Sequence, residues 1–173
     1  IINNKNITFH LINFNNKSDI ERIFYDYKVD IIFHAAAFKH VPLIELNPFS
    51  AIKNNFLDTF EFMKLITKFN IKNFCLISSD KAVRPTNIMG ASKSICELYC
   101  QNIKSNNTKI ISVRFGNVLG SSGSVIPKFQ KQINNDNDIS VTHKNITRFF
   151  MLVNEACNLV YQAASIGNLS LIH

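Results

Sequence analysis

Short apolar runs alternate along this chain with longer segments in which apolar residues recur at helical spacing. The runs of strand length are residues 7–12, 30–34, 74–77 and 110–114, and residues 169–172 begin one more. The helical patterns span residues 19–27, 48–68, 88–104 and 154–164, and a further helix starts at Val125. Ser18 is a candidate N-cap, residues 39–42 a loop, and residues 141–143 a short extended segment. Strand and helix alternate without a repeat or a linker, which predicts an α/β fold with a doubly wound parallel sheet.

The most reactive side chains follow the strand predicted at residues 74–77. Ser78, Ser79, Asp80 and Lys81 come directly after it, and Lys93 falls on the first turns of the next helix. Because open α/β sheets bind ligands at the carboxyl ends of their strands, this cluster indicates a functional site. A polar turn followed by a capped helix is the alternative interpretation of the same residues.

Two other strand ends have a composition suited to ligands. Ala35, Ala36 and Ala37 follow the second strand, where small side chains let a ligand approach the backbone. Residues 115–124 hold three of the five glycines, so this loop either cradles phosphate through backbone N–H groups or is a flexible turn. No G-x-G-x-x-G turn follows the first strand. The chain therefore has another α/β fold or begins after that element.

Composition narrows the class of protein. Hydrophobic residues make up 46% of the chain and charged residues 18%, which is typical of one globular domain over residues 1–173. No apolar run reaches the roughly 18 residues of a membrane span, and the N-terminus is not a signal peptide. The net charge of +7 suits a nucleotide, but it is scattered, without the basic block of a nucleic-acid reader. The four cysteines form no Cys-x-x-Cys pair, which favours buried thiols in a reducing cytoplasm over a metal site.

Four segments carry a resemblance to a known family, namely residues 33–42, 78–93, 113–127 and 141–151. In sequence and in order they resemble the polysaccharide-biosynthesis branch of the extended short-chain dehydrogenase/reductases, which are nucleotide-sugar 4,6-dehydratases of the capsular and flagellin-glycosylation type. The resemblance implies a Rossmann-like sheet that is incomplete at its N-terminus, in the middle of a longer protein. It also implies a cytoplasmic homo-oligomer without a nucleic-acid partner. A membrane anchor would come only from segments outside this chain.

The resemblance places an NADP or NAD site on particular residues. The matching cofactor positions are Asn13, Ala35, Ala36, Ala37, Lys39, Asn55 and Lys93. Asn13 stands where the family usually has an Asp facing the adenine amino group, and an amide oxygen can still accept that hydrogen bond. Lys93 resembles the lysine that holds the nicotinamide ribose. Asn55 resembles a structural asparagine of the neighbouring helix.

The catalytic positions implied by the resemblance are Ser79, Asp80, Lys81, Met89 and Lys93. Ser79 would hold the C4 hydroxyl of the sugar, Asp80 would protonate the C6 hydroxyl, and Lys81 would remove the C5 proton. Burial must disfavour the charged form of Lys81 for this role, because a neighbouring carboxylate favours it. Met89 replaces the tyrosine of the superfamily's Tyr-x-x-x-Lys, and a thioether has no proton to exchange. Larger, membrane-anchored members of the family also have Met there, which indicates a sub-family trait; an inactive enzyme is the alternative.

The implied substrate is a UDP-sugar, UDP-N-acetylglucosamine, and the implied product is a 4-keto-6-deoxy sugar. The substrate-binding positions are His40, Asn117, Ser121, Ser122, Thr147 and Arg148, with Asn117, Arg148 and the loop of residues 116–124 facing the diphosphate. A 4- or 5-epimerase is the nearest rival and differs in whether C6 loses its oxygen. A nucleotide-binding pseudoenzyme or fragment is the other alternative. Residues 1–173 alone are expected neither to bind the cofactor tightly nor to turn over substrate.

Overall fold

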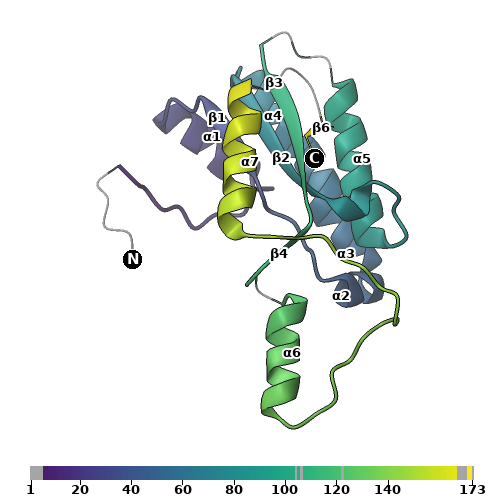
Figure 1. Ribbon diagram of the computed structural model, residues 1–173. Helices are drawn as coiled ribbons and strands as arrows, with labels where there is room; N and C mark the ends of the chain where they lie inside the picture. The colour runs from purple at the N-terminus through teal and green to yellow at the C-terminus, as the bar shows by residue number, and fades with distance from the viewer. Residues whose placement is uncertain (1–5, 104, 106, 122, 167–170, 173) are drawn as a thin grey trace.

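A four-stranded parallel sheet with strand order β1-β2-β3-β6 forms the centre of the computed structural model, which describes residues 6–103, 105, 107–121, 123–166, 171 and 172 (Figure 1). The strands are β1 (Ile31–His34), β2 (Asn73–Ser79), β3 (Lys109–Phe115) and β6 (Leu171–Ile172). Seven residue pairs join β2 to β3, from Asn73↔Lys109 to Ser79↔Phe115. The parallel sheet confirms the predicted fold class.

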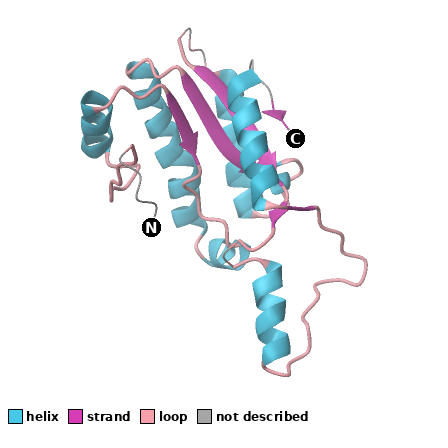
Figure 2. Ribbon diagram, turned by 60° about the vertical axis from the view of Figure 1, so that its left-hand side comes forward, coloured by secondary structure: helices cyan, strands magenta, loops and turns pink. Residues whose placement is uncertain are grey.

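Helices cover both faces of this sheet (Figure 2). The helices of the described residues are α1 (Lys17–Asp26), α2 (Val41–Leu46), α3 (Pro48–Ile52), α4 (Asp58–Lys68), α5 (Ile88–Asn102), α6 (Val125–Asn134) and α7 (Val153–Ile166). A π-helical turn, η1 (Lys53–Leu57), joins α3 to α4, and a 3₁₀ turn, η2 (Asp80–Ala82), follows β2. Two short strands, β4 (Asn117–Val118) and β5 (Phe150–Met151), pair separately in parallel. The predicted helix of residues 48–68 is therefore correct in extent but contains a π turn.

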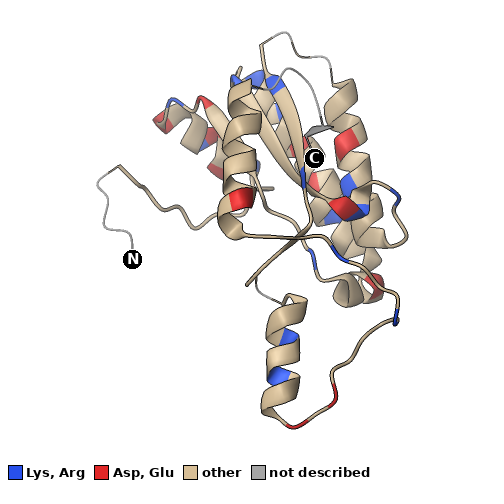
Figure 3. Cartoon of the chain, viewed as in Figure 1, with Lys and Arg blue, Asp and Glu red and all other residues tan. Residues whose placement is uncertain are grey.

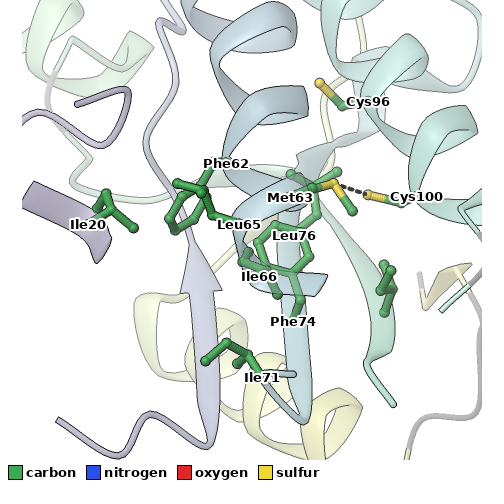
Figure 4. Close-up of a cluster of buried hydrophobic side chains, with 11 residues drawn as sticks. Ile20, Phe62, Met63, Leu65, Ile66, Ile71, Phe74, Leu76, Cys96 and Cys100 are labelled. Carbon is green, nitrogen blue, oxygen red and sulfur yellow. Dashed lines mark hydrogen bonds between the residues drawn. The ribbon is translucent and has the colours of Figure 1, made fainter. Parts of the chain in front are cut away.

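The core forms because β2 alternates its side chains between the two layers of helices. Phe74 and Leu76 pack with the helices α4 and α5, and Cys75 packs on the other face against Ala163 of α7. Figure 4 shows the larger cluster, in which the Cys100 thiol lies 3.6 Å from the Met63 sulfur. Fully burying a Phe or Leu side chain stabilises the fold by about 1.5–3 kcal/mol. Phe74 and Leu76 are at most 1% exposed, so this burial holds β2 firmly between the two layers of helices.

Three of the four thiols lie in this interior, as the sequence predicted. Cys75, Cys96 and Cys100 are each at most 2% exposed, whereas Cys157 is exposed, so the prediction was wrong for Cys157. Burial raises the pKa of Cys75 and Cys96 to about 11 and that of Cys100 to about 12. These three thiols therefore stay protonated at neutral pH. No group of three or more metal-ligating side chains occurs within the described part of the chain.

Several local predictions were wrong. Residues 7–12 form no strand, because no described strand lies beside them to pair with their backbone. Asn16, two residues before Ser18, is the N-cap of α1, since its extended backbone directs its amide oxygen to the Asp19 N–H. The helix α2 takes up the second half of the predicted loop 39–42, and its early Pro42 suits a first helical turn. Residues 141–143 are irregular.

The helix α6 stands apart from the sheet and contains no buried residue (Figure 1). Lys and Arg residues are distributed over helices, strand ends and loops (Figure 3). Within the described ranges, no helix combines the length and the apolar character needed to cross a bilayer.

Candidate active site

Four polar side chains meet at the carboxyl end of β2. The Ser79 hydroxyl donates to Asp80 Oδ1 at 3.0 Å, and Lys81 Nζ lies 2.9 Å from the same oxygen. Asn117, which follows β3, accepts from Lys81 Nζ at 3.4 Å. The side chains of Asp80 and Lys81 are 40% and 32% exposed, so a substrate can reach them. The burial that Lys81 needs to act as a base is not supplied by the described residues alone.

The helix α5 places Lys93 directly behind this cluster. Lys93 is 8% exposed, and its Nζ donates to the Ile77 carbonyl of β2 at 2.8 Å. Burial lowers the pKa of Lys93. Asn87 caps the helix by accepting from the Gly90 N–H at 2.8 Å. Gly90 has no room for a Cβ, which would collide with the Lys81 carbonyl, so the start of α5 lies directly against η2.

Met89 has an apolar environment. It is 5% exposed and clusters with Ile44 of α2 and Ala51 of α3. Its side chain therefore packs α5 against these two short helices. This role depends on an apolar side chain and not on a hydroxyl group such as that of tyrosine. The sequence did not reveal this role, and a contribution of Met89 to the site remains a prediction.

Two cavities adjoin at the end of β1. One of about 660 Å³ is lined by residues that include Asn13, Ala36 and Ala37. The other, of about 520 Å³, includes Ala37, Lys39 and His40 in its lining. Ala35 and Ala36 are exposed, as close approach of a ligand to the backbone requires. The two cavities share Ala37 and Phe38 in their linings and so both border the chain after β1.

Buried polar side chains form hydrogen bonds at both ends of residues 35–37. Asn55, 2% exposed, accepts from the Phe38 N–H at 2.8 Å and donates to the Phe38 carbonyl at 3.0 Å. His34, 4% exposed, has its Nε2 3.0 Å from the Thr59 hydroxyl. Sequence reasoning missed His34 and Thr59, although His34 directly precedes Ala35 and Thr59 is four residues after Asn55. Asn55 is predicted to bind the cofactor, and the geometry shows it holding the backbone that lines the cavities.

The loop of residues 116–124 lies against His40, which lines the second cavity. Gly120 and Gly123 have positive φ angles of 73° and 66°, which favour glycine. A Cβ on Gly123 would collide with the His40 ring, so this loop lies against the loop after β1. Ser121 is part of the turn through its backbone, and Ser122 lies outside the described residues.

The pairing of β4 with β5 brings the segment of Thr147 and Arg148 to this loop. Phe149 accepts from the Asn117 N–H at 2.8 Å and closes over Gly116, which leaves no room for a Cβ there. Thr147 and Arg148 themselves are exposed, and Arg148 Nη1 donates to the Thr147 carbonyl at 2.9 Å. Both lie beside the site without contacting the cluster around Lys81 through a described hydrogen bond.

A buried ion pair links α5 to β3. Arg114 Nε lies 3.0 and 3.1 Å from the two carboxylate oxygens of Glu97, and Arg114 Nη2 lies 2.5 Å from Oε2. The two side chains are 13% and 3% exposed. The carboxylate of Glu97 raises the pKa of Arg114. This pair was missed in the sequence because its members are 17 residues apart and belong to different elements.

The burial of His34 predicts a pH dependence of stability. Burial, with a smaller effect of the Lys93 charge, lowers the pKa of His34 to about 4. In the unfolded chain a histidine titrates near 6.5, so below that pH the unfolded chain binds a proton that the folded chain excludes. The free energy of unfolding should therefore fall by about 2 kcal/mol between pH 7 and pH 5. Urea denaturation of the full-length gene product at both pH values measures this fall.

The matched variants are His34→Gln, which removes the titrating group, and His143→Gln at an exposed position. His34→Gln should show a clearly smaller fall, and His143→Gln should match the unaltered protein. An equal fall in both variants would show that His34 does not cause the pH dependence.

The parallel sheet with helices on both faces, with titratable side chains at the end of one strand and a buried lysine on the following helix, is a Rossmann-like α/β fold. The chain belongs to the polysaccharide biosynthesis protein family, whose sequence model matches residues 1–172. This membership confirms the family resemblance seen in the sequence.

Relatives and solved structures agree with this assignment. The capsular polysaccharide biosynthesis protein CapD of Staphylococcus aureus is 46% identical over 154 residues, which cover 88% of this chain and 26% of CapD. The probable polysaccharide biosynthesis protein EpsC of Bacillus subtilis is 44% identical, covering 94% of this chain and 28% of EpsC. A UDP-glucose 4-epimerase of Rickettsia bellii is 36% identical, covering 96% of this chain and 50% of the epimerase. The chain thus spans between about a quarter and a half of the length of these relatives.

Among solved structures, Pen from Bacillus thuringiensis matches 98% of this chain and 54% of its own chain, with a TM-score of 0.87 and 35% identity. The UDP-glucose 4-epimerase of Thermus thermophilus in complex with NAD matches 98% of this chain and 64% of its own, with a TM-score of 0.84. At 18% identity the second match shows the shared fold alone.

Proposed function

We propose that this chain provides the catalytic part of a nucleotide-sugar 4,6-dehydratase that acts on UDP-N-acetylglucosamine. The observation that carries the proposal is the hydrogen-bonded cluster of Ser79, Asp80, Lys81 and Asn117. It combines a carboxyl group and an amine within 2.9 Å of each other at an accessible strand end. Elimination of water from a sugar requires such an acid and such a base side by side.

The residues at the end of β1 fit a dinucleotide cofactor. Exposed alanines give access to the backbone, and of the two cavities beside them one is lined in part by Asn13 and the other in part by Lys39. Asn13 can accept from the adenine amino group, and Lys93, behind the cluster, can hold the nicotinamide ribose. The chemistry that a bound NADP or NAD supplies is reversible hydride transfer, from C4 of the sugar and later to C6. The UDP-glucose 4-epimerase of Thermus thermophilus, solved in complex with NAD, is an example of a protein of this fold that holds such a cofactor.

The side chains of the cluster divide the proton transfers among them. Ser79 would hold the C4 hydroxyl and pass its proton to the solvent that reaches the cluster, and the carbonyl left at C4 would make the C5 proton acidic. Lys81 removes that proton, while Asp80 protonates the C6 hydroxyl so that it leaves as water. A sugar seated over the cluster removes solvent from Lys81 and Asp80, which disfavours both charged forms, so that the proton of the Lys81 ammonium group passes to the Asp80 carboxylate. Lys81, protonated by that step, would return a proton to C5 when the cofactor returns its hydride to C6, which would give the 4-keto-6-deoxy product.

The substrate diphosphate lies along the glycine loop in this proposal. Backbone N–H groups of residues 116–124, together with Arg148, face it, and Asn117 connects this loop to Lys81. The substrate side of the proposed site is completed by His40, which contacts Gly123. It also includes Ser121 and Ser122 on the loop and the exposed Thr147.

A nucleotide-sugar 4-epimerase is the second candidate, because the Rickettsia bellii relative of that name is 36% identical over 172 residues. The two reactions share oxidation at C4. They differ at C6, where only a dehydratase releases oxygen, and at C5, where a 4-epimerase needs no base.

The product formed in deuterated water separates these functions. The full-length gene product is incubated with UDP-N-acetylglucosamine and either NADP or NAD, and the sugar is examined by NMR and mass spectrometry. A dehydratase should give a sugar that has lost one water and carries deuterium at C5. An intact sugar inverted at C4, with hydrogen retained at C5, would establish an epimerase instead. Recovery of unchanged substrate with both cofactors would contradict both functions.

A further inference from the structure

Side chains on one face of the helical segment α3–η1–α4 form hydrogen bonds to the residues on either side of Ala35, Ala36 and Ala37. Ala51, Asn55 and Thr59 are spaced four residues apart, and each is at most 2% exposed. Thr59 contacts His34, the residue before Ala35, and Asn55 pairs with the backbone of Phe38, the residue after Ala37. The segment between them therefore has a buried polar anchor on each side.

The Asn55 side chain pairs with the Phe38 backbone in the way that a neighbouring β-strand would. The Asn55 amide accepts from the Phe38 N–H and donates to the Phe38 carbonyl, as a backbone peptide group does in a sheet. Asn55 lies in the π turn η1, and such turns occur frequently at functional sites. Because Phe38 lines both cavities, this pairing sets the shape of each.

Ser92 connects the same anchor to α5. Its hydroxyl, in a residue 2% exposed, accepts from Asn55 Nδ2 at 3.2 Å and donates to the Met89 carbonyl at 2.8 Å. Ser92 immediately precedes Lys93, whose Nζ contacts β2. A continuous buried hydrogen-bond path thus runs from the backbone of the alanine segment to the helix turn that carries Lys93.

We infer that Thr59 and Ser92 are positioning residues of the cofactor site, which with Asn55 clamp residues 35–37 at both ends and hold them at a set distance from Lys93. This inference rests on the proposed cofactor site. Its physical basis is the cost of leaving buried amide or hydroxyl groups without partners, which keeps every member of the network in place.

The test uses Ser92→Ala and Thr59→Val in the full-length gene product. Ser112→Ala is the control, because Ser112 is buried to a similar degree, at 4% exposure, on β3 away from Asn55. Hydrogen–deuterium exchange measures the Phe38 amide, and calorimetry measures the Kd for NAD and NADP. If Ser92→Ala does not fold, Ser92→Cys, with a similar volume and a weaker donor, takes its place.

Ser92→Ala should accelerate exchange of the Phe38 amide and raise the Kd about tenfold, which is the effect of losing one well-formed hydrogen bond. Thr59→Val should raise the Kd to a similar extent, and Ser112→Ala should change neither quantity. Unchanged exchange at Phe38 in Ser92→Ala would overturn the clamp alone. Faster exchange with an unchanged Kd would overturn its role in the cofactor site. If the unaltered protein binds neither dinucleotide, the proposed function fails, and the role of the clamp in cofactor binding fails with it.

Discussion

Lys81→Ala in the full-length gene product should lower dehydration of UDP-N-acetylglucosamine by about 10²–10⁴-fold, the usual contribution of a general acid–base group. The reason is that Lys81 is the amine next to Asp80 and Asn117 at the site. Oxidation at C4 does not require this amine. Reduced cofactor should therefore still form and be seen by its absorbance, while deuterium from the solvent should no longer enter C5.

Two further variants make this result specific. Asp80→Asn should allow deuterium to enter C5 but slow the loss of the C6 oxygen, because the acid and not the base is removed. Lys72→Ala, an exposed lysine at the opposite end of β2, should leave turnover unchanged. Exchange at C5 in Lys81→Ala at the rate of the unaltered enzyme would place the base elsewhere.

Arg114→Met should lower the free energy of unfolding by about 3–5 kcal/mol. The substitution keeps a long apolar side chain but leaves the Glu97 carboxylate, 3% exposed, without its guanidinium fork. A buried charge without its partner keeps the full cost of its desolvation. Chemical denaturation of the unaltered and variant proteins at neutral pH measures the difference.

The double variant Arg114→Met/Glu97→Met removes both charges and should recover most of the loss, because apolar side chains can replace a buried pair at little cost. Lys72→Met breaks the exposed pair with Asp30 and should change stability by no more than about 0.5 kcal/mol. If Arg114→Met had as small an effect as Lys72→Met, the buried pair would not contribute to the fold.

Local signals in the sequence were sufficient for most of the elements and for the centre of the site. The alternation of strand and helix predicted β1, β2, β3 and α5, because periodicity and caps depend on neighbouring residues. Ser79, Asp80 and Lys81 are consecutive, so they lie close together at the end of β2 whatever the rest of the fold is. A motif that is contiguous in the sequence needs no long-range folding to be recognised.

Contacts between distant segments were decided by the tertiary structure. The register of β2 and β3 determines that Asn117 reaches Lys81, 36 residues away, and that Arg114 meets Glu97. The rotation of α5 directs Met89 into an apolar cluster and Ser92 toward Asn55. Strand register and helix rotation are set by packing of the whole core, which no local pattern encodes.

Residues 7–12 show that a local pattern can also predict an element that does not form. Their apolar pattern is typical of a strand, yet strand hydrogen bonds need a neighbour, and the described sheet ends at β1. The sequence by itself therefore determined the class of fold and the reactive residues of one strand end. The tertiary structure decided which distant side chains join them, because each such contact depends on how whole elements pack against one another.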